Sequence, residues 1–534
     1  MKRLIVSLIF FVTIPFTYAQ QTYVPDDNFE QALIDLGYDD VLDNYVLTAN
    51  ISSVASLDVD SLSISDLTGI EGFTALTYLK CTNNQLTILD VSANTALTKL
   101  QSFNNLLTNL DLSANTALKY FSCTNNFLTT LDLSSNTVLD TLHCVNNQLT
   151  SLDVSNNNDL TLLRCQNNQI TTIDVSGAIA LNTLHCQNNQ LTTLDVSTNT
   201  ALTYLQCRDN QITTIDVSGA IALNTLHCHN NQITALDVSN NTELYKLTCH
   251  NNQLTILDVI NNTDLGVLKF GNNQLTSLDV SNNTALTLLN CNENQLTSLD
   301  VSSNTALTSL QCYDNQLNYL NMRNGVTDAL TTFDATNNDS LECIETLNPT
   351  YATENWTYEN GNIDEGVTFT VNCTPFFGPV WHVATTGSNE EGNGSEDFPF
   401  ATIQEARNYA SDGDTIMLAP GEYEFTSIDF NTNYSYNQTI MSSSGAESTI
   451  LSNTNFFITT NDSTLVIDGF TFANYISSGG EDVPLIIWGG SPTIKNCIFT
   501  HNTNSSHTST ISIAGPATKP TIINCLFYEN EAYG

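Results

Sequence analysis

Apolar residues recur along most of this chain in a fixed pattern of 21 residues. The unit from Leu76 to Ala96 reads LTYLKCTNNQLTILDVSANTA, and twelve such units follow one another over residues 76–327. Repetition at a short fixed period indicates a solenoid, in which each coil buries its apolar side chains against its neighbours. The pattern therefore predicts a long stack of similar coils rather than several globular domains.

Each unit contains two short segments in which apolar and polar residues alternate. Residues 79–81 read Leu-Lys-Cys, and residues 89–91, half a unit later, read Leu-Asp-Val. Successive side chains of a strand point to opposite faces, so we expect the outer two residues of each segment inside and the central one outside. Every coil is thus predicted to have two extended sides.

The repeated pattern LxxLxCxxNxLxxLDVSxN resembles the leucine-rich repeat, in a short form with cysteine at the third apolar position. The resemblance implies a parallel-stranded solenoid with asparagine at the inner turn, its side chain bonded to the backbone. Residues 20–75 are expected to form an N-terminal cap with irregular first repeats. The stretch TYVPDDNFEQALIDLG resembles cap segments of secreted leucine-rich repeat proteins of the Bacteroidetes. Within it, Asp26 is placed to cap a helix that ends near Gly37.

Ten cysteines share one position of the repeat, and Ser102 and Phe270 fill the two remaining places. A position that Ser or Phe can occupy is not an obligatory disulfide partner or metal ligand. Stacked coils lie about 4.8 Å apart, farther than the ~3.8 Å between Cβ atoms in a disulfide. We therefore expect buried free thiols that act as small apolar side chains. The ten residues are Cys81, Cys123, Cys144, Cys165, Cys186, Cys207, Cys228, Cys249, Cys291 and Cys312.

The register breaks after Leu320, and residues 328–375 are predicted to be the C-terminal cap of the repeats. Cys343 and Cys373 lie outside the cysteine column. They are the candidate disulfide, which would stabilise the cap by roughly 3 to 4 kcal/mol in the loop-entropy model.

The 21-residue period is absent from residues 380–534. Thr402 and Glu405 form a capping box for a short helix, and PTIKNCIF recurs 28 residues later as PTIINCLF. These segments resemble the start of a right-handed parallel β-helix with a pectate-lyase-like fold. The expected fold class is therefore mainly β, a leucine-rich repeat solenoid followed by a right-handed parallel β-helix. Because the sequence stops directly after a coil, we expect this second domain to be truncated.

Residues 1–19 have the layout of a secretory signal peptide, with Lys2 and Arg3 before an apolar run. No later segment reaches the eighteen or so apolar residues of a membrane span. The chain has only 13 Lys and Arg but 55 Asp and Glu, which gives a formal charge of −42. This charge excludes binding to duplex nucleic acid. It also argues against docking on anionic membranes. The protein is expected to be secreted or displayed on the cell surface.

Aspartate occupies one outward position in eleven successive repeats, for example Asp90 and Asp111. Like charges about 5 Å apart repel by roughly 0.8 kcal/mol even in bulk water, so such a column needs compensation. Hydrogen bonds from nearby backbone N–H groups or from the serine two residues on would supply it. Bound Ca²⁺ is the alternative, although no known calcium-binding motif is present.

On the other extended side, the outward positions vary between repeats and are largely polar, basic or aromatic. They hold most of the lysines and arginines of the repeats and all five histidines. Such side chains on a rigid sheet suit recognition of a protein or glycan; the alternative is incidental drift among soluble residues. His227 and His229 lack a third ligand, so no metal site is predicted. The candidate ligand-binding residues are Tyr78, Lys80, Lys99, Tyr120, His143, Arg164, His185, Tyr204, Arg208, His227, His229, His250 and Lys269.

The sequence leaves two main functions open, beside a purely structural role in an extracellular matrix. The favoured one is a secreted or cell-surface adhesion and recognition protein that binds a protein or glycan on this side of the repeats, without catalysis. The alternative is a carbohydrate-active enzyme, either a polysaccharide lyase or a glycoside hydrolase, with its site in the β-helix. A lyase base such as Lys495 is available, but Asp468, Glu481 and Asp482 do not form the evident pair that a hydrolase needs. No catalytic residue is assigned.

Overall fold

The chain forms two compact units, residues 1–368, here the repeat unit, and residues 369–534, here the β-helix unit. This computed structural model describes residues 19–373, 378–389, 392–425, 428–429, 438–458, 465–477, 483–504, 510–515 and 518–532. The predicted signal peptide lies almost wholly outside the described residues. Within them, none of the helices has the length and apolar character that a membrane crossing requires.

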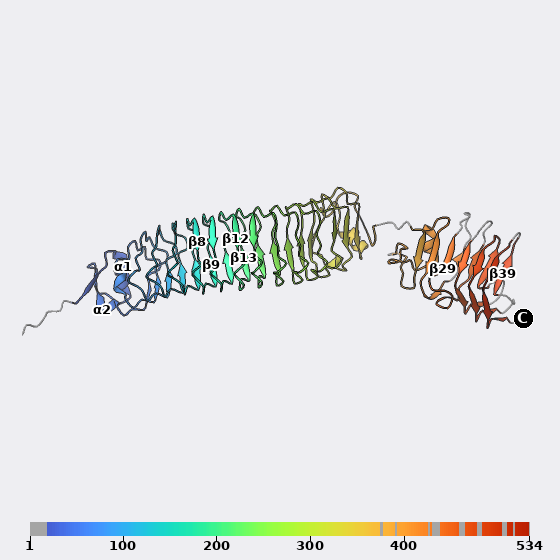
Figure 1. Ribbon diagram of the computed structural model, residues 1–534, viewed down its shortest axis with the longest axis horizontal. Coiled ribbons are helices and arrows are strands. Elements are labelled where there is room, and N and C mark those ends of the chain that lie inside the picture. The colour runs from blue at the N-terminus through green and yellow to red at the C-terminus, as the bar shows by residue number, and fades with distance from the viewer. Residues whose placement is uncertain are drawn as a thin grey trace, which may run out of the picture. The chain divides into compact units, whose positions relative to one another are not determined.

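A small cap precedes the coils of the repeat unit (Figure 1). Asp26 accepts hydrogen bonds from the backbone N–H groups of Asn28 and Phe29, both at 3.0 Å, and so begins the first helix. Gly37, at φ +80°, follows the helix end, so the predicted cap helix is confirmed. The elements of the cap are β1 (Gln21–Tyr23), α1 (Asp27–Asp35), β2 (Tyr45–Leu47), α2 (Thr48–Ile51) and η1 (Ile70–Gly72).

One continuous parallel sheet of fourteen strands runs along the repeat unit. Each strand pairs with its equivalent in the next coil, so that Leu79 lies beside Leu100 and Lys80 beside Gln101. The central leucine is buried and its neighbours face outward, as the alternation predicts. The strands are β3 (Ser56–Asp58), β4 (Tyr78–Lys80), β5 (Lys99–Gln101), β6 (Tyr120–Ser122), β7 (Thr141–His143), β9 (Leu162–Arg164), β11 (Thr183–His185), β13 (Tyr204–Gln206), β15 (Thr225–His227), β16 (Lys246–Thr248), β17 (Val267–Lys269), β18 (Leu288–Asn290), β20 (Ser309–Gln311) and β22 (Thr332–Asp334).

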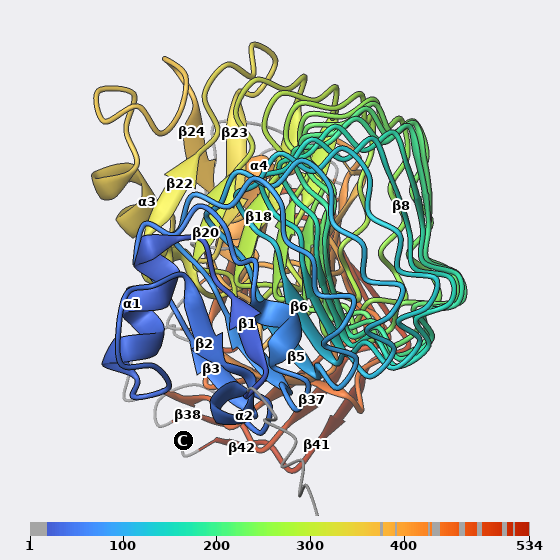
Figure 2. The same ribbon diagram turned by 90° about the vertical axis from the view of Figure 1, so that its left-hand side faces the viewer.

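The second extended side of the coils lies opposite this sheet, as β8 does in Figure 2. Leu89 and Val91 are buried there and Asp90 is exposed, as predicted. Regular strands form in only some of the coils, and the described coils between them keep the same burial pattern without strand pairing. The strands are β8 (Ser151–Asp153), β10 (Thr172–Asp174), β12 (Thr193–Asp195), β14 (Thr214–Asp216), β19 (Ser298–Asp300) and β21 (Tyr319–Met322).

Buried asparagines join successive coils at two turns. Asn126 donates to the backbone carbonyls of Ser102 and Cys123, both at 3.0 Å, and its Oδ1 accepts the N–H of Leu107 at 3.0 Å. This is the asparagine that the repeat resemblance implies. At the second turn, Asn115 donates to the carbonyls of Val91 and Asn94, both at 3.0 Å. Because buried backbone carbonyls require donors, these amides hold each coil to the one before it.

Two coils lack the second buried asparagine and carry Ala178 or Ala220 instead. The preceding residue is then glycine in both coils. A Cβ atom on Gly177 would lie 1.7 Å from the carbonyl oxygen of Ser155, so the backbone itself fills the space there and no larger residue fits.

The cysteine column is a row of buried free thiols, as predicted. Several thiols donate to a carbonyl of the next coil, for example Cys165 Sγ to His185 O at 3.5 Å. Burial raises the pKa of Cys144 to about 12. Ser102 occupies one of the two positions of the column that lack cysteine, and its hydroxyl makes the equivalent contact with Ser122 O at 3.4 Å.

The repeat unit ends in an irregular cap. Cys343 and Cys373, the predicted pair, are both disulfide-bonded, whereas the other cysteines are free. Asp364 accepts the backbone N–H groups of Asn337 and Asn338 at 2.8 and 2.7 Å, which ties the cap to the last coil. The elements here are η2 (Thr327–Ala329), β23 (Cys343–Thr346) and α3 (Pro349–Asn355), and β24 (Thr368–Thr370) begins at the last residue of the unit.

The β-helix unit stacks parallel strands from successive coils around an apolar core. Thr402 caps α4 (Ile403–Tyr409), as predicted, by accepting the N–H of Glu405 at 3.2 Å. Ile494 pairs with Ile522, which confirms the 28-residue repeat.

The strands of the β-helix unit fall into four groups. One contains β25 (Val380–Val383), β26 (Thr415–Leu418), β29 (Thr439–Ser442), β32 (Val466–Asp468), β36 (Thr493–Lys495) and β40 (Thr521–Ile523). A second contains β27 (Gly421–Glu424), β30 (Thr449–Ser452), β33 (Thr471–Ala473), β37 (Ile498–Thr500) and β41 (Leu526–Tyr528). The others contain β28 (Ile428–Asp429), β31 (Phe456–Ile458), β35 (Leu485–Trp488) and β39 (Ile511–Ala514), and β34 (Ile476–Ser477), β38 (Thr503–Asn504) and β42 (Glu531–Ala532).

The asparagine bonds predict a contrast between two neighbouring residues. Asn241 is fully buried and donates to Val217 O and Ala220 O at 3.0 and 2.8 Å, whereas exposed Asn240 makes one bond, to Ser218 O at 3.2 Å. Asn241→Ala should lower the free energy of unfolding by about 2 kcal/mol, and Asn240→Ala by under about 0.5 kcal/mol. Urea denaturation measures both, and equal effects would contradict this account of coil stacking.

The buried thiols predict chemical inertness in the folded protein. At about pH 8 the ten cysteines of the column should resist iodoacetamide, because their raised pKa values and burial leave almost no accessible thiolate. In denaturant they should all be alkylated. Peptide mass spectrometry counts the modified residues, and rapid labelling of Cys144 or Cys186 in the native protein would contradict the burial described.

Candidate recognition face

The outward side of the fourteen-stranded sheet carries three columns of variable residues, here called the variable face. The columns stand at the positions of Tyr78, Lys80 and Thr82 in each coil. The residue-by-residue register of the strands places ten of the thirteen predicted ligand-binding residues side by side. The other three, Arg208, His229 and His250, lie two residues after the second column, just beyond the strand ends. Ligand binding by these residues stays a prediction.

At the N-terminal end of the variable face, a lysine lies between two tyrosines. Lys99 Nζ is 4.8 Å from the ring centre of Tyr78 and 5.1 Å from that of Tyr120, which is cation–π geometry. Lys80 Nζ instead pairs with Asp58 at 3.2 Å and Asp60 at 3.3 Å. Lys80 is thus neutralised within the chain, and Lys99 remains as the local positive charge.

Aromatic rings continue across the middle of the variable face in what we call the ring row. Ring centres are 5.1 Å apart for His185 and Tyr204, 5.8 Å for Tyr204 and His227, and 6.2 Å for His227 and His229. His229 and His250 stack at 4.2 Å. These five half-buried rings form a continuous, ordered strip across neighbouring strands.

The histidines of the ring row are held by hydrogen bonds. His185 Nδ1 lies 3.0 Å from Gln206 Oε1, and His227 and His229 both approach Thr248 Oγ1, at 2.7 and 3.1 Å. Burial, assisted by neighbouring cationic groups, lowers the pKa of His227 and of His229 to about 4. These histidines therefore present neutral rings at neutral pH, so the positive charge of the variable face comes from its lysines and arginines.

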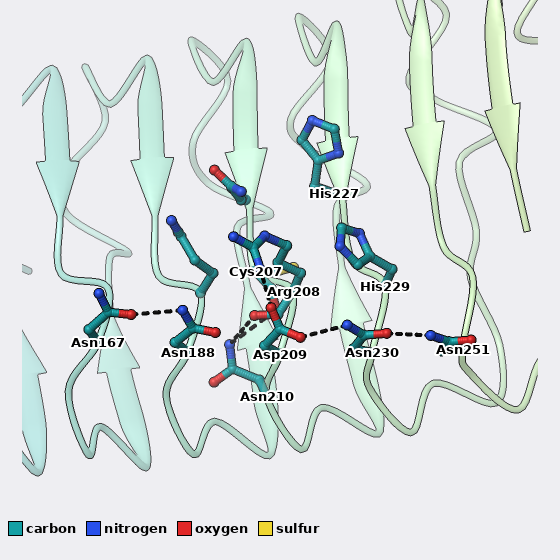
Figure 3. A network of polar contacts seen from close by, with 12 residues as sticks. Asn167, Asn188, Cys207, Arg208, Asp209, Asn210, His227, His229, Asn230 and Asn251 are labelled. Atoms are coloured by element: carbon teal, nitrogen blue, oxygen red, sulfur yellow. Dashed lines mark hydrogen bonds and ion pairs between the residues drawn. The ribbon is translucent and has the colours of Figure 1, made fainter.

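A row of side-chain amides borders the variable face, and sequence reasoning did not identify it. Residues with φ near +55° occupy this turn of every coil, a conformation that asparagine tolerates well. Asn188 donates to Asn167 at 2.7 Å, and Asn251 to Asn230 at 2.6 Å (Figure 3). The first asparagine of the Asn-Asn pair that recurs in the repeats is the sequence feature from which this row could have been predicted.

Acidic residues interrupt this asparagine row. Asp209 has no amide to donate to Asn188, so the row stops between them; Asp209 instead accepts from Asn230 at 2.6 Å and pairs with Arg208 (Figure 3). Glu293 interrupts the row again, beside a depression of about 270 Å³ in the variable face. Of the residues lining it, only His250 and Lys269 were predicted. The lining is His250, Asn251, Lys269, Gly271, Asn272, Asn290, Asn292, Glu293 and Tyr313.

The aspartate column on the second side is compensated by hydrogen bonds, as favoured from the sequence. Asp90 Oδ1 accepts the N–H of Ser92 at 2.9 Å, and Asp111 that of Ser113 at 2.8 Å. Bonds from the Ser92 side chain and backbone lower the pKa of Asp90. Among the described residues, no three His, Cys, Asp or Glu side chains converge as metal ligands would.

In the β-helix unit, the candidate lyase base is engaged in an ion pair. Lys495 Nζ lies 3.1 Å from Asp468, which also accepts from Asn496 Nδ2 at 2.7 Å. The other two acids that the sequence suggested, Glu481 and Asp482, lie outside the described residues.

Comparisons with known proteins find similarity within the repeats. Residues 77–105 match the LVIVD repeat family. A segment of 78 residues is 37% identical to internalin J of Listeria monocytogenes and spans 15% of this chain, but only 8% of that protein's length. The repeat unit is similar to internalin leucine-rich repeats.

Two solved structures are similar as well. The functional domain of internalin J from Listeria monocytogenes, described as including a cysteine ladder, is 30% identical, with 76% of this chain and 84% of that one covered and a TM-score of 0.46. The internalin InlF from the same species is 25% identical, with 58% and 95% covered and a TM-score of 0.48.

The lowered histidine pKa values predict acid sensitivity. Because His227 and His229 titrate near 4 when folded but near 6.5 when unfolded, the unfolded chain binds more protons between these values. Stability should therefore fall as the pH falls from about 6.5 to about 4. Replacing both histidines with glutamine should make this decline shallower in urea titrations at several pH values. Superimposable profiles for the two proteins would contradict the neutral state assigned to these rings.

Proposed function

We propose that this chain is a secreted or cell-surface adhesion protein that binds a folded protein partner through the variable face. The ring row is the observation that carries the proposal. Its five rings are ordered by stacking and by hydrogen bonds before any partner arrives. Binding then costs little side-chain entropy, which favours affinity, and aromatic residues dominate the energetics of protein interfaces.

The charges around the ring row indicate what kind of partner surface fits. In the described part of the chain, ion pairs on this face engage Lys80 and Arg208 but leave Arg164 and Lys246 without an acidic partner. Most of the molecule is acidic, with a formal charge of −42. A partner patch with carboxylates beside apolar side chains would match Arg164, Lys246 and the rings, while the acidic remainder disfavours other contacts.

Export of the chain rests on its N-terminal sequence. Lys2 and Arg3 precede an apolar run with small residues after it, as in a secretory signal peptide. The similarity to internalin repeats agrees with a role in adhesion and protein interaction outside the cell.

Substitution of the variable face tests the proposal. Partners are first selected by screening the chain from residue 20 onward against purified extracellular protein domains. The variant with His143, Arg164 and His185 all replaced by serine should bind a selected partner about 10 to 100 times more weakly, measured by surface plasmon resonance.

The matched control lies on the second side of the same three coils. Ser151, Thr172 and Thr193 are exposed there, and their replacement by alanine should leave the affinity unchanged. Equal affinity of the His143, Arg164 and His185 variant and the wild-type chain for every selected partner would overturn the proposal.

A further inference from the structure

We propose that the depression beside Glu293 binds a single sugar ring, a neutral hexopyranose, so that the partner of the variable face is glycosylated. The inference rests on the proposed function, because it treats the variable face as a recognition surface. It adds a ligand class and a site that the ring row does not supply.

One coil lacks a side chain in the lining of the depression. Gly271 stands in the third column of the variable face, where the coils of Gln166, Gln187 and Arg208 carry long side chains. Its φ lies outside the left-handed region, so the backbone does not require glycine. A Cβ atom at this position would lie 2.3 Å from Oδ1 of Asn292. The Asn292 side chain therefore lies directly against the backbone of Gly271, and a side chain at position 271 would displace it.

Hydrogen bonds fix the polar walls of this space. Asn292 Nδ2 donates to Glu293 Oε1 at 3.1 Å and to the Tyr313 hydroxyl at 3.0 Å. Asn290 Nδ2 donates to Gln311 Oε1 at 2.9 Å. Walls that are ordered in this way lose little entropy when a ligand binds.

The interrupted asparagine row leaves acceptors at the rim. Except at Asn188, which is followed by Asp209, each asparagine oxygen of the row before Asn272 receives the amide of the next coil, as Asn251 receives Asn272 at 3.0 Å. The next residue after Asn272 in the row is Glu293, and an ionised carboxylate cannot donate. Asn272 Oδ1 and the second Glu293 oxygen are therefore open acceptors, and the ammonium of Lys269 is a donor beside them.

This combination of groups matches a sugar ring. Each sugar hydroxyl both donates and accepts, so it can bridge Lys269 and an acceptor such as Glu293. The rings of His250 and Tyr313 add apolar surface with polar edges. A volume of about 270 Å³ corresponds to roughly nine water molecules at ~30 Å³ each, the size of one monosaccharide. One cation next to one carboxylate favours a neutral ligand over a charged one.

Saturation-transfer NMR with methyl glycosides of glucose, galactose, mannose and N-acetylglucosamine tests the site in the full chain from residue 20 onward. At least one glycoside should bind with a Kd of about 1 to 10 mM. Gly271→Gln, which installs the side chain that other coils carry in this column, should weaken that binding at least tenfold. Lys269→Met should weaken it as well. Val145→Gln adds the same side chain to the same column in another coil and should leave binding unchanged.

Thermal melts of the variants establish that each is folded. Absence of saturation transfer to any of the four glycosides would overturn the inference, as would binding by folded Gly271→Gln equal to that of the wild-type chain. Either result leaves the proposed function standing, because that proposal is tested by the His143, Arg164 and His185 variant and a protein partner. Conversely, loss of the protein partner does not change the sugar result.

Discussion

The structure of the repeat unit depends on buried asparagine side chains that bond backbone groups of successive coils. A short coil of 21 residues has turns whose carbonyl groups point into the stack, away from water. Asn115 and its equivalents donate to two of these carbonyls, both in the preceding coil. An unpaired buried carbonyl costs about 1 to 3 kcal/mol, so the amide fixes both the spacing and the register of the stack. The leucine and cysteine layers then pack at a constant separation.

Because the register is fixed, the residues that differ between repeats lie side by side on one surface. Because the equivalent residues of neighbouring coils lie side by side, Tyr204 contacts a histidine of the coil on either side, although those residues are 19 and 23 positions away along the chain. The same register places Gly271 against the Asn292 side chain of the next coil, and both line the depression. The variable face is therefore both rigid and easily changed by single substitutions.

Much of this structure could be predicted from the sequence, because each 21-residue repeat corresponds to one coil. Alternation around Lys80 and Asp90 gave the two extended sides, and the place of Ser102 within the cysteine column indicated free thiols. The Asp–Ser spacing indicated the bonds that compensate the aspartate column. Each of these features depends on residues within one coil or on strict periodicity.

Other features depend on how different coils combine. The lowered pKa of His229 comes from burial and from His250 in the next coil, and neither is visible in a single repeat. The asparagine row and its interruption at Asp209 require the left-handed turn to be known. The lining of the depression combines side chains from several neighbouring coils. Regular strands on the second side form in some coils only, a difference that the recurring apolar-Asp-apolar pattern does not predict.

Hydroxyl-radical footprinting of the chain with and without a bound protein partner tests the central claim most directly, since it maps exposed side chains one by one. The account predicts that oxidation of Tyr78, Tyr120 and Tyr204 on the variable face falls several-fold in the complex. Tyr358, exposed in the C-terminal cap, should be oxidised equally in both states. Protection of Tyr358 with unchanged oxidation of the three face tyrosines would contradict the claim that recognition takes place on the variable face.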